Sequence, residues 1–487
     1  RLENFIQAIR DRQTHDLPED AIDRARLCLA MAYDDWDSLF ADVERHRDAI
    51  TRQFGTVAFR EDKEGTPFRT RLARAWESGA DEAAWTTLLS AEEVVESDRL
   101  ARALVSFAND TGTKQVDAVS RERLQNFVPR LVEEVVHCER PGLALARALN
   151  IVEQILRRSA YLSLLNENPA ALAKLVDLCA RSSYVAEEIA RYPVLLDELL
   201  DPHLFPESIS KKDIAAELAA RLGTAELDGE ERMRAIGQFQ RAMMFRIAIA
   251  DFSDRLPIMK VSDGLTWLAE VILEEALQVA WRDLTARHGV PQCTRDGVVH
   301  EAGFGIIAYG KLGGLELSYG SDLDIVFLHD SLGTQQATNG EKPLDNAVFF
   351  GRLVRRLTHL LTMQTGSGQL YEIDTRLRPD GHKGLLVTST EAFERYQEEN
   401  AWTWEHQALL RARAVAGSEA IASEFERIRR ETLFERVRRD RLRDDVIEMR
   451  LRMRKELDRS DSESFDLKHG RGGIGDVEFL VQYLVLL

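Results

Sequence analysis

"AYGKLGGLELSYGSDLDIVFLHD", residues 308–330, places two acidic residues, Asp322 and Asp324, in a segment whose second half is otherwise apolar. Leu323 and residues 325–328 are of the types that a buried strand prefers. An ionised carboxylate is costly to remove from water unless a cation or several hydrogen-bond donors compensate for it. The segment therefore predicts a buried strand with a positively charged partner close to the two aspartates.

Short apolar segments bounded by Gly or Asp predict a small sheet around this strand. Residues 303–310 and 321–330 indicate two strands joined by a tight turn and a brief helix. An amphipathic helix is expected over residues 347–364, and a third strand over 368–381, ending in a Pro-Asp-Gly turn. The polar residues 330–346 are expected to form a mobile loop. Helical patterns precede and follow, so the predicted fold class is mostly α, with an α/β sheet inserted among helical domains.

The alternation of side chains along a strand predicts that acidic residues from two strands meet. Residues two apart share a face, so Asp322 and Asp324 point the same way while their apolar neighbours face the core. In the segment "YEIDTRLR" the same rule places four charged residues on one face: Glu372, Asp374, Arg376 and Arg378. If the strands are neighbours, Asp374 joins the other two aspartates in a cluster flanked by arginines. Crowded carboxylates hold protons unless a metal ion neutralises them.

Magnesium ions and a nucleotide would satisfy such a cluster. Mg²⁺ prefers a few carboxylates together with substrate phosphates, and two ions about 4 Å apart stabilise both the entering and the leaving oxygen of an in-line phosphoryl displacement. A turn at Gly313 and Gly314 would let the backbone approach a phosphate, and a helix beginning at Leu315 would offer unpaired N–H groups. The residues expected to bind the nucleotide are Gly313, Gly314, Ser321, Lys311, Arg376 and Arg378.

Each of these features also has an ordinary structural explanation. A Gly-Gly pair after a strand is often only a turn, alternating acids often mark a solvated face, and the arginines could be surface ion-pair partners. The order of the features favours a site, because a strand, Gly-Gly, seven residues, Asp-x-Asp, a helix and a further aspartate follow one another. The histidines form no H-E-x-x-H motif, so zinc catalysis is not indicated, and His329 is expected to be structural or at a rim.

Composition narrows the class of protein. With 487 residues, 44% of them hydrophobic, the chain can bury two or three cores. Its 64 basic and 82 acidic residues give a net charge of −18, which opposes binding to nucleic acid. The four cysteines form no C-x-x-C motif and indicate reduced thiols. Residues 1–13 do not resemble a signal sequence, and no segment reaches the ~18 apolar residues of a membrane span, so a cytoplasmic protein without a membrane partner is expected.

Several other segments have weaker functional interpretations. Trp404 or His406 could lie against a nucleotide base, although core packing is the more common role of such residues. Residues 424–459 interleave basic and acidic residues at helical spacing, which predicts an exposed, salt-bridged helix. In residues 469–479, a helix N-cap explains Asp476 without a function. The absence of an initiator Met and the helical pattern at the last residues indicate a fragment of a longer protein.

Gly313-Gly314, Asp322-x-Asp324 and the distant Asp374 resemble the nucleotidyltransferase fold of the polymerase-β superfamily. The longer strings "AYGKLGGLELSYGSDLDIVFLHD", "LYEIDTRLRPDG", "YQEENAWTWEHQALLRAR" and "GGIGDVEFLVQYL" resemble the glutamine synthetase adenylyltransferase family. The resemblance implies that the three aspartates bind metal and that the two glycines form the phosphate turn. In this family an N-terminal domain removes AMP by phosphorolysis and a C-terminal domain attaches it, and this chain is similar to the attaching half.

The resemblance also implies a domain organisation. Residues 1–145 would form a helical regulatory or linker domain, residues 146–435 the adenylyltransferase catalytic domain, and residues 436–487 the start of a truncated C-terminal helical domain. Within the catalytic domain, a helical lead-in would span residues 146–290 and the α/β nucleotidyltransferase core residues 291–435.

On this resemblance the expected reaction is transfer of AMP from ATP to a tyrosine hydroxyl of glutamine synthetase, with release of pyrophosphate. Asp322 and Asp324 would hold two Mg²⁺ ions, and Asp374 would bind the catalytic ion and help accept the hydroxyl proton. The implied regulators are the PII signal protein and glutamine, in nitrogen metabolism. Two alternatives stay open: phosphorolytic removal of AMP from the modified synthetase, and a non-catalytic module that binds PII and glutamine. A polymerase or RNA-modifying transferase is disfavoured by the net charge.

Overall fold

In a computed structural model, the described residues are 5–6, 17–18, 20–43, 45–46, 66–156, 158–200, 209–223, 229–366 and 368–487. The chain divides into two compact units, Arg1–Ala80 and Asp81–Leu487. This division does not test the domain boundaries expected at residues 145, 290 and 435, which stay predictions.

The first unit contains the helices α2 (Ala21–Met31) and α4 (Pro67–Glu77). Asp20 caps α2 by accepting a hydrogen bond from the backbone of Ile22, and α2 ends at Ala32 in the left-handed conformation. Leu27 and Leu39 are buried in a small apolar cluster. Much of the expected linker, including most of residues 1–13, lies outside the described residues.

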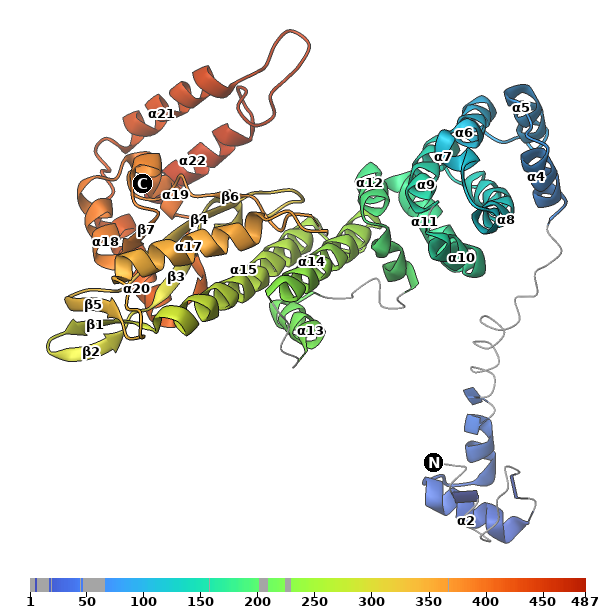
Figure 1. Ribbon diagram of the computed structural model, residues 1–487, viewed down its shortest axis with the longest axis horizontal. Coiled ribbons are helices and arrows are strands. Elements are labelled where there is room, and N and C mark those ends of the chain that lie inside the picture. Colours follow the sequence, from blue (N-terminus) through green and yellow to red (C-terminus); the bar gives the residue numbers. More distant parts are fainter. Residues whose placement is uncertain are drawn as a thin grey trace. The chain divides into compact units, whose positions relative to one another are not determined.

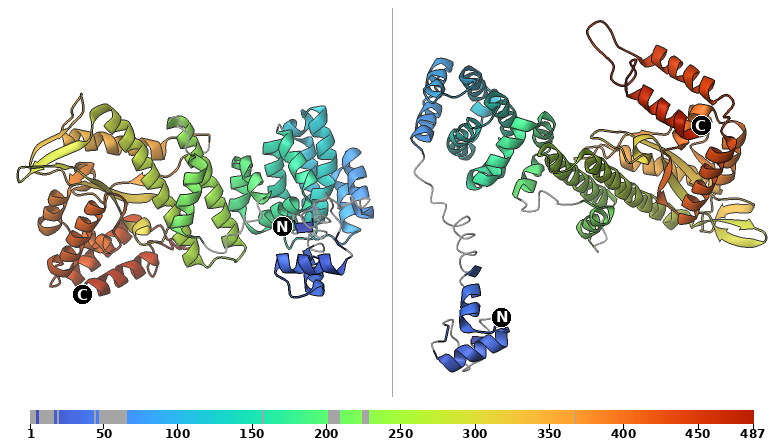
Figure 2. Two further views of the ribbon diagram at one scale, coloured as in Figure 1. Left: turned by 90° about the horizontal axis from the view of Figure 1, so that it is seen from below. Right: turned by 180° about the vertical axis from the view of Figure 1, so that it is seen from behind.

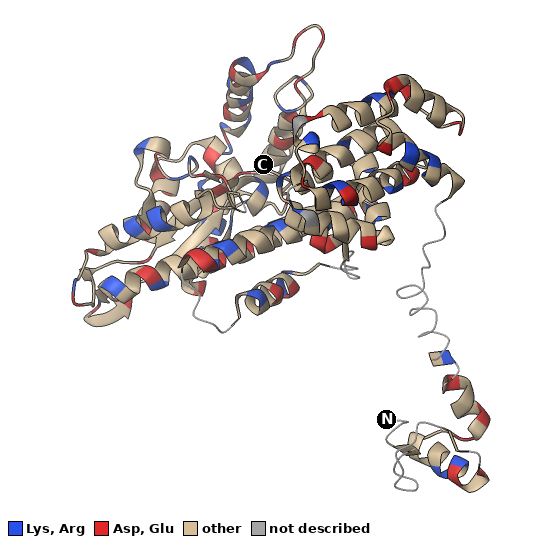
Figure 3. Ribbon diagram, turned by 45° about the vertical axis from the view of Figure 1, so that its right-hand side comes forward, with Lys and Arg blue, Asp and Glu red and all other residues tan. Residues whose placement is uncertain are grey.

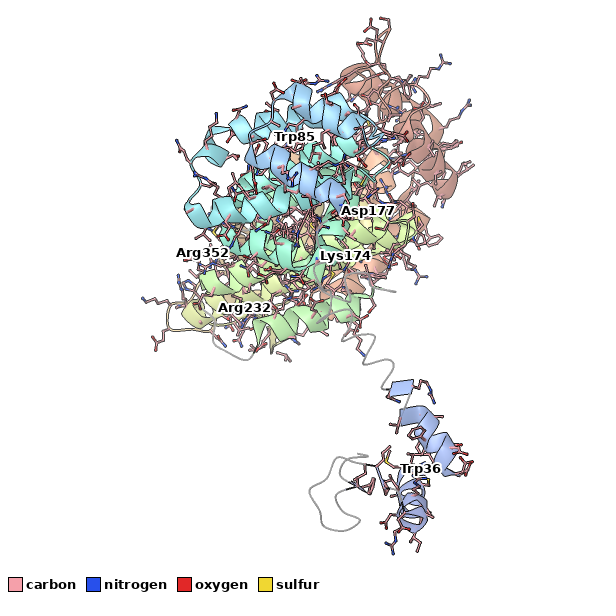
Figure 4. All side chains as sticks on the ribbon, turned by 90° about the vertical axis from the view of Figure 1, so that its right-hand side faces the viewer. Trp36, Trp85, Lys174, Asp177, Arg232 and Arg352 are labelled. Carbon is pink, nitrogen blue, oxygen red and sulfur yellow. The ribbon has the colours of Figure 1, made fainter. Side chains whose placement is uncertain are left out.

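The second unit begins with a helical array that buries its apolar stripes around α9 (Figures 1 and 2). Its elements are α5 (Glu82–Ser90), α6 (Ser97–Asn109), α7 (Thr111–Lys114), α8 (Ala118–Val135), α9 (Pro141–Ile155), α10 (Ser159–Glu167), α11 (Pro169–Arg181), α12 (Ser183–Arg191) and η1 (Pro193–Leu200). Proline at the first position starts α9 and α11. Trp85 of α5 is one of the large buried side chains of this array (Figure 4).

Three further helices connect this array to the sheet. They are α13 (Lys211–Leu222), α14 (Gly229–Phe252) and the long α15 (Ile258–His288). Helices α14 and α15 lie side by side, and their facing residues, such as Phe239 and Ile272, are fully buried (Figures 1 and 2). Figure 3 shows acidic and basic residues interspersed along the described helices, as the mixed charge of the sequence indicates.

The central sheet has the strand order β6-β4-β3-β8, with β7 also paired to β4. The strands are β3 (Phe304–Ala308), β4 (Leu323–His329), β6 (Ile373–Asp374), β7 (Val387–Ser389) and β8 (Arg413–Gly417). Strands β3 and β4 are antiparallel and confirm the strands expected from the sequence, whereas β6 and β7 run parallel to β4. The expected third strand over 368–381 is wrong in extent, because only two of its residues form a strand before the chain turns away.

Helices cover both faces of this sheet. Leu323, Ile325 and Phe327 pack with α15 and with α17 (Asn346–Thr362), which confirms the helix expected over 347–364. Val326 and Leu328 face the other core, formed with α18 (Thr390–Glu399), α19 (Thr403–Leu409) and α20 (Glu419–Glu431). The expected alternation along β4 is therefore confirmed, and the mostly helical class with a small inserted sheet is correct.

A second sheet, of order β2-β1-β5, was not expected from the sequence. It consists of β1 (Pro291–Arg295), β2 (Val298–Glu301) and β5 (Thr334–Thr338). Strand β5 lies inside the segment expected to be a mobile loop, so that expectation is wrong. Asp296 and Gly297 both have positive φ and form the tight turn between β1 and β2, which is the conformation that an Asp-Gly pair favours.

The C-terminal part corrects two expectations. The charged run 424–459 does not form one helix, because it is interrupted between η3 (Thr432–Arg436) and α21 (Leu442–Leu457). The last helix, α22 (Ile474–Leu486), has Gly473 as its N-cap, so Asp476 is not the cap. Instead Asp476 pairs with Arg450 and Arg454 of α21.

The cysteines and the hydropathy of the helices bear on the class of protein. The four cysteines carry free thiols, as expected. Among the helices in the described part of the chain, none is both long enough and apolar enough to cross a membrane.

Candidate active site

The three aspartates converge at the start of β4 and the end of β6. Asp324 is directly opposite Asp374 in the parallel ladder between the two strands. Asp322 precedes β4 by one residue and is exposed, whereas Asp324 and Asp374 are half-buried. Because Asp324 lies two residues before Val326, its side chain is on the sheet face that α18, α19 and α20 cover. The expectation that the two strands are neighbours is confirmed.

The carboxylates of this cluster outnumber the cations close to them, and this affects the pKa of Asp324. Burial, and then the charges of Asp322 and Asp374, raise the pKa of Asp324 to about 6. Arg376 and Lys468 oppose this rise. Asp324 therefore holds a proton at mildly acidic pH, as the crowding of acids along the sequence predicts.

Asp374 differs from Asp324 because it has a dedicated cation. Although burial opposes it, hydrogen bonds from Arg376 hold the pKa of Asp374 below its usual value. The backbone N–H of Arg376 donates to Oδ1 at 2.8 Å, and its Nε donates to Oδ2 at 2.6 Å. These bonds form because the strand ends at Asp374 and the next residues fold back on it. Arg376 thus approaches Asp374 through a local turn and not through strand alternation.

Arg378 occupies a different environment from the one expected. It is buried, and its guanidinium donates to the carbonyl of Thr375 at 2.8 Å and to the hydroxyl of Thr375 at 2.9 Å. A longer bond reaches the carbonyl of Gly384 at 3.4 Å. These bonds close the loop that follows β6, so its donors are used within that loop.

The turn after β3 begins earlier than the sequence indicated. The short helix α16 spans Gly310–Gly313, so the expectation of a helix beginning at Leu315 is wrong. Leu315 instead has a positive φ of 60°. Gly310 also has a positive φ, and a Cβ there would lie 2.2 Å from Oδ2 of Asp324. Sequence reasoning missed Gly310, although a glycine two residues after a buried strand was a usable signal.

The two glycines expected to contact phosphate have other close neighbours. A Cβ at Gly313 would lie 2.0 Å from the carbonyl oxygen of Arg411, so this glycine is required by a close approach of two backbone segments. A Cβ at Gly314 would lie 2.9 Å from the side chain of Glu316. Gly314 follows α16 directly, and its backbone N–H donates to the carbonyl of Gly310.

Lys311 and Ser321, both expected to bind the nucleotide, belong to one hydrogen-bonded loop. The Lys311 ammonium lies 3.4 Å from the hydroxyl of Ser318. The hydroxyls of Ser318 and Ser321 are 3.0 Å apart, and Ser318 N–H donates to Ser321 Oγ at 3.2 Å. The structure therefore brings Lys311 and Ser321 together next to Asp322.

A charge network around the buried Glu270 supports α16. Arg413 donates to the carbonyl of Leu312 at 2.9 Å and to that of Gly313 at 3.0 Å. Its guanidinium also pairs with Glu270 of α15, which in turn accepts from Lys211 at 2.5 Å. No local pattern in the sequence pointed to this network, because its members come from three distant elements.

The two histidines singled out from the sequence are structural. His406 is buried, its Nε2 lies 3.2 Å from the carbonyl of Gln397, and burial lowers its pKa. His329 stacks on Phe350 with a centroid separation of 4.7 Å, and burial lowers its pKa to about 4. The expected structural role of His329 is thus supported.

A cavity of about 380 Å³ opens beside this region. Its lining includes Ser321 and Glu372 from the site loops and Arg191 and Arg241 from α12 and α14. Arg241 is largely buried and pairs with Glu188 at 3.5 Å. The cavity therefore joins the helical array to the loop that carries Ser321.

The donor set fits a hard divalent cation in its chemistry. Within the described ranges, no three His, Cys, Asp or Glu side chains converge closely enough to hold a metal ion. The three aspartates nevertheless offer oxygen ligands only, which Mg²⁺ prefers. Burial and the charges of Asp322 and Asp374 raise the pKa of Asp324, and a cation bound there would oppose this rise. A cation at Asp374 would share or replace the bonds that Arg376 makes.

Comparisons with known proteins give a consistent result. A family model described as glutamate-ammonia ligase adenylyltransferase matches residues 172–428, more than half of the chain. A second model, GlnD PII-uridylyltransferase, matches residues 1–58.

Curated relatives extend the similarity over the whole chain. Each is named a bifunctional glutamine synthetase adenylyltransferase/adenylyl-removing enzyme. The protein of Thioalkalivibrio sulfidiphilus is 45% identical over 494 residues, covering 100% of this chain and 51% of the relative. That of Pseudomonas syringae pv. tomato is 44% identical over 513 residues, with 99% and 51% covered. That of Nitrosococcus oceani is 43% identical over 490 residues, with 100% and 51% covered. The chain spans about half the length of these relatives.

Proposed function

The chain belongs to the glutamate-ammonia ligase adenylyltransferase family, and on this basis we propose that it transfers AMP from ATP to a tyrosine hydroxyl of glutamine synthetase. The tyrosine oxygen would bond to the α-phosphorus, the bond from that phosphorus to the oxygen bridging the β-phosphate would break, and pyrophosphate would leave. The hydroxyl proton would pass to a base or to water. The relatives' printed names, which include both adenylylation and its removal, support this substrate.

The proposal rests on one observation, the pairing of Asp324 with Asp374 on neighbouring strands. Asp322 lies two residues before Asp324, and Gly310 at the start of α16 lies against the Asp324 carboxylate. We propose that Asp322, Asp324 and Asp374 hold two Mg²⁺ ions. Bound there, Mg²⁺ would neutralise the phosphates and polarise the reacting phosphoryl group. Arg376 keeps Asp374 ionised, which suits a metal ligand better than a proton acceptor.

The nucleotide contacts proposed from this chain follow from the loop after β3. Lys311 and Ser321 lie together beside Asp322 and would face the phosphates. The backbone at Gly314 lies at the end of the α16 turn and belongs to the same proposal. Gly313 and Arg378 are assigned structural roles instead, because their contacts are with the backbone of this chain.

The wider context is also part of the proposal. The catalytic domain would span residues 146–435, in keeping with the family match at 172–428. PII signal protein and glutamine would regulate the enzyme, and the match of residues 1–58 to GlnD PII-uridylyltransferase supports a connection with PII signalling. With ATP and glutamine synthetase as substrates, the proposed location is the cytoplasm.

The test is to incubate the protein with purified glutamine synthetase, Mg²⁺ and ATP labelled in the α-phosphate. Label should appear on the synthetase and should be lost with Asp374→Asn. A parallel incubation of adenylylated synthetase with phosphate distinguishes the opposite reaction. If label is released there and none is attached in the first assay, the chain is the adenylyl-removing half. If neither reaction occurs while the fold is intact, the proposal of an enzyme is wrong.

A further inference from the structure

The cavity of about 380 Å³ beside the site has no role so far, and its lining adjoins the aspartate cluster. Ser321, in the lining, directly precedes Asp322, and Glu372, also in the lining, lies two residues before Asp374. The carbonyl of Glu372 accepts a hydrogen bond from the backbone N–H of Leu323 at 2.9 Å, which continues the pairing of β6 with β4. The cavity is therefore adjacent to two of the three aspartates.

Tyr319 holds the wall that carries Ser321 against the helices. Its hydroxyl donates to Asp251 of α14 at 3.0 Å. The centroid of its ring is 5.1 Å from that of Tyr184 on α12 and 6.2 Å from that of Phe252 on α14. Helices α12 and α14 are themselves in contact (Figure 1). These contacts fix the distance between the two walls of the cavity.

The cations in the lining already have acidic partners. Arg241 pairs with Glu188 at 3.5 Å and donates to the carbonyl of Gln369 at 3.1 Å. Arg191 is more exposed and pairs with the same Glu188 at 3.8 Å. Because Glu372 adds a second carboxylate, the charges of the lining side chains balance. The cavity therefore suits an uncharged group better than a chain of phosphates.

The rest of the lining combines apolar walls with one available carboxylate. The apolar side chains are Leu265, Leu317, Leu370 and Met244. Within the described residues, the carboxylate of Glu372 has neither a cation nor a hydrogen-bond donor in bonding range. Apolar walls with a few polar groups are typical of small-molecule sites, and a carboxylate is a common acceptor for ribose hydroxyls. A nucleoside matches this lining, since its base is planar and its sugar carries hydroxyls.

We infer that the cavity binds the nucleoside of the substrate, with Glu372 accepting hydrogen bonds from the ribose hydroxyls. The inference rests on the proposed function, in which the α-phosphorus reacts at the aspartates. Because one ester oxygen links that phosphorus to the ribose, the sugar must lie next to the aspartates, where the cavity is. Glu372 then distinguishes a ribonucleotide from a nucleotide that lacks the sugar hydroxyls.

The first test compares ATP with 2′,3′-dideoxy-ATP in AMP transfer. The wild type should prefer ATP by about tenfold in kcat/KM, because the analogue cannot donate to the charged carboxylate. Glu372→Ala should reduce this preference to less than about twofold, since the two changes remove the same interaction. Glu372→Gln keeps one acceptor oxygen and should lie between them. Glu301→Ala, at an exposed position of β2, is the matched control and should keep the wild-type preference.

The second test measures binding without reaction. The Kd of AMP, measured by calorimetry, should rise about tenfold in Glu372→Ala. Met244→Trp, which fills the cavity from α14, should also weaken the binding of AMP. The Kd of pyrophosphate with Mg²⁺ should stay at the wild-type value in both variants, because phosphates lie outside the cavity. An equal loss of affinity for pyrophosphate would overturn the inference.

The two proposals fail in different ways. If AMP transfer occurs but Glu372→Ala keeps both the full preference for ATP and the wild-type Kd of AMP, the inference about the cavity is overturned and the proposed function stands. If the protein transfers no AMP but binds it in a manner that depends on Glu372, the proposed function fails and the nucleoside site stands.

Discussion

Two carboxylates near α16, Glu270 on α15 and Asp324 on β4, have opposite surroundings. The Glu270 side chain is only 3% exposed and has two cations, Arg413 and Lys211. Asp324 is less buried but has Asp322 and Asp374 as its neighbours, and its pKa rises to about 6. A carboxylate with sufficient cations supports the fold, whereas a surplus of carboxylates costs stability. By this difference Glu270 belongs to the packing of the fold, and Asp324 belongs to the proposed site.

The largest expected effect is that of Asp324 on the rate of AMP transfer. Asp324→Asn should reduce the rate of AMP transfer by about 10³-fold or more, because it removes a proposed ligand of the ions that stabilise the transition state. Initial rates with labelled ATP measure the effect. Glu448→Gln, at an exposed ion pair on α21, serves as the control and should transfer AMP at the wild-type rate. A variant Asp324→Asn with near wild-type rates would remove Asp324 from the site.

The next largest effect is that of Glu270 on the free energy of unfolding. Glu270→Gln should lower the free energy of unfolding by about 2 to 3 kcal/mol, because Arg413 and Lys211 lose their buried partner. Urea denaturation measures it. Glu448→Gln, whose partner Arg452 is also exposed, should change this free energy by less than about 0.5 kcal/mol. Equal effects of the two substitutions would show that the network behind α16 does not support the fold.

A smaller effect, on the free energy of unfolding, has opposite signs for Asp324→Asn and Asp374→Asn. The pKa of Asp324 in the folded protein, about 6, lies above the ordinary value of 3.8 for an aspartate, so protonation favours the folded state. The stability that protonation contributes is complete below about pH 4 and is lost as the pH rises through about 6. At pH 8, Asp324→Asn should therefore increase the free energy of unfolding by about 1 to 2 kcal/mol, after allowance for solvent screening. This gain should disappear near pH 4.

Asp374→Asn is the matched control and should act in the opposite direction. The pKa of Asp374 is lowered in the folded protein, so its ionised form contributes stability at neutral pH that is lost on acidification. Denaturation curves at pH 8 should show Asp374→Asn less stable than the wild type. If both substitutions stabilise the protein, Arg376 does not compensate Asp374 as its hydrogen bonds indicate.

The smallest effect is that of the metal ion itself. Mg²⁺ at five times its dissociation constant should raise the free energy of unfolding by about 1 kcal/mol, because it binds only the folded state. Addition of EDTA should reverse the shift in melting temperature. Glu270→Gln should keep this response and Asp324→Asn should lose it. A response that persists in Asp324→Asn would move the ion to another part of the chain.

The elements that were predicted correctly are those with strong local patterns. Strands β3 and β4 are short apolar segments bounded by Gly or Asp, and helix α17 is clearly amphipathic. The alternation of side chains along a strand was sufficient to place Asp322 and Asp324 on one face. Asp374 could be added because charged residues alternate with other residues in its segment, as in a strand with one polar face. The two-residue length of β6 depends on where the chain turns back, which periodicity does not report.

The parts that were missed depend on contacts between distant segments. Strand β5 is polar and becomes a strand only by pairing with β1, about forty residues earlier in the sequence. The network of Glu270 and Arg413 joins residues 143 positions apart. Arg411 joins Glu316, near the turn after β3, to Glu478 of α22, and both partners are distant from it in the sequence. No local window of sequence contains this information.

Gly310 limits how the carboxylate of Asp324 can be placed. A Cβ at residue 310 would lie 2.2 Å from Oδ2 of Asp324, so alanine there would displace this carboxylate, and the positive φ of 53° would strain its backbone as well. The position of this carboxylate therefore depends on a residue fourteen positions earlier, and a mutational scan for activity should find position 310 intolerant of any side chain.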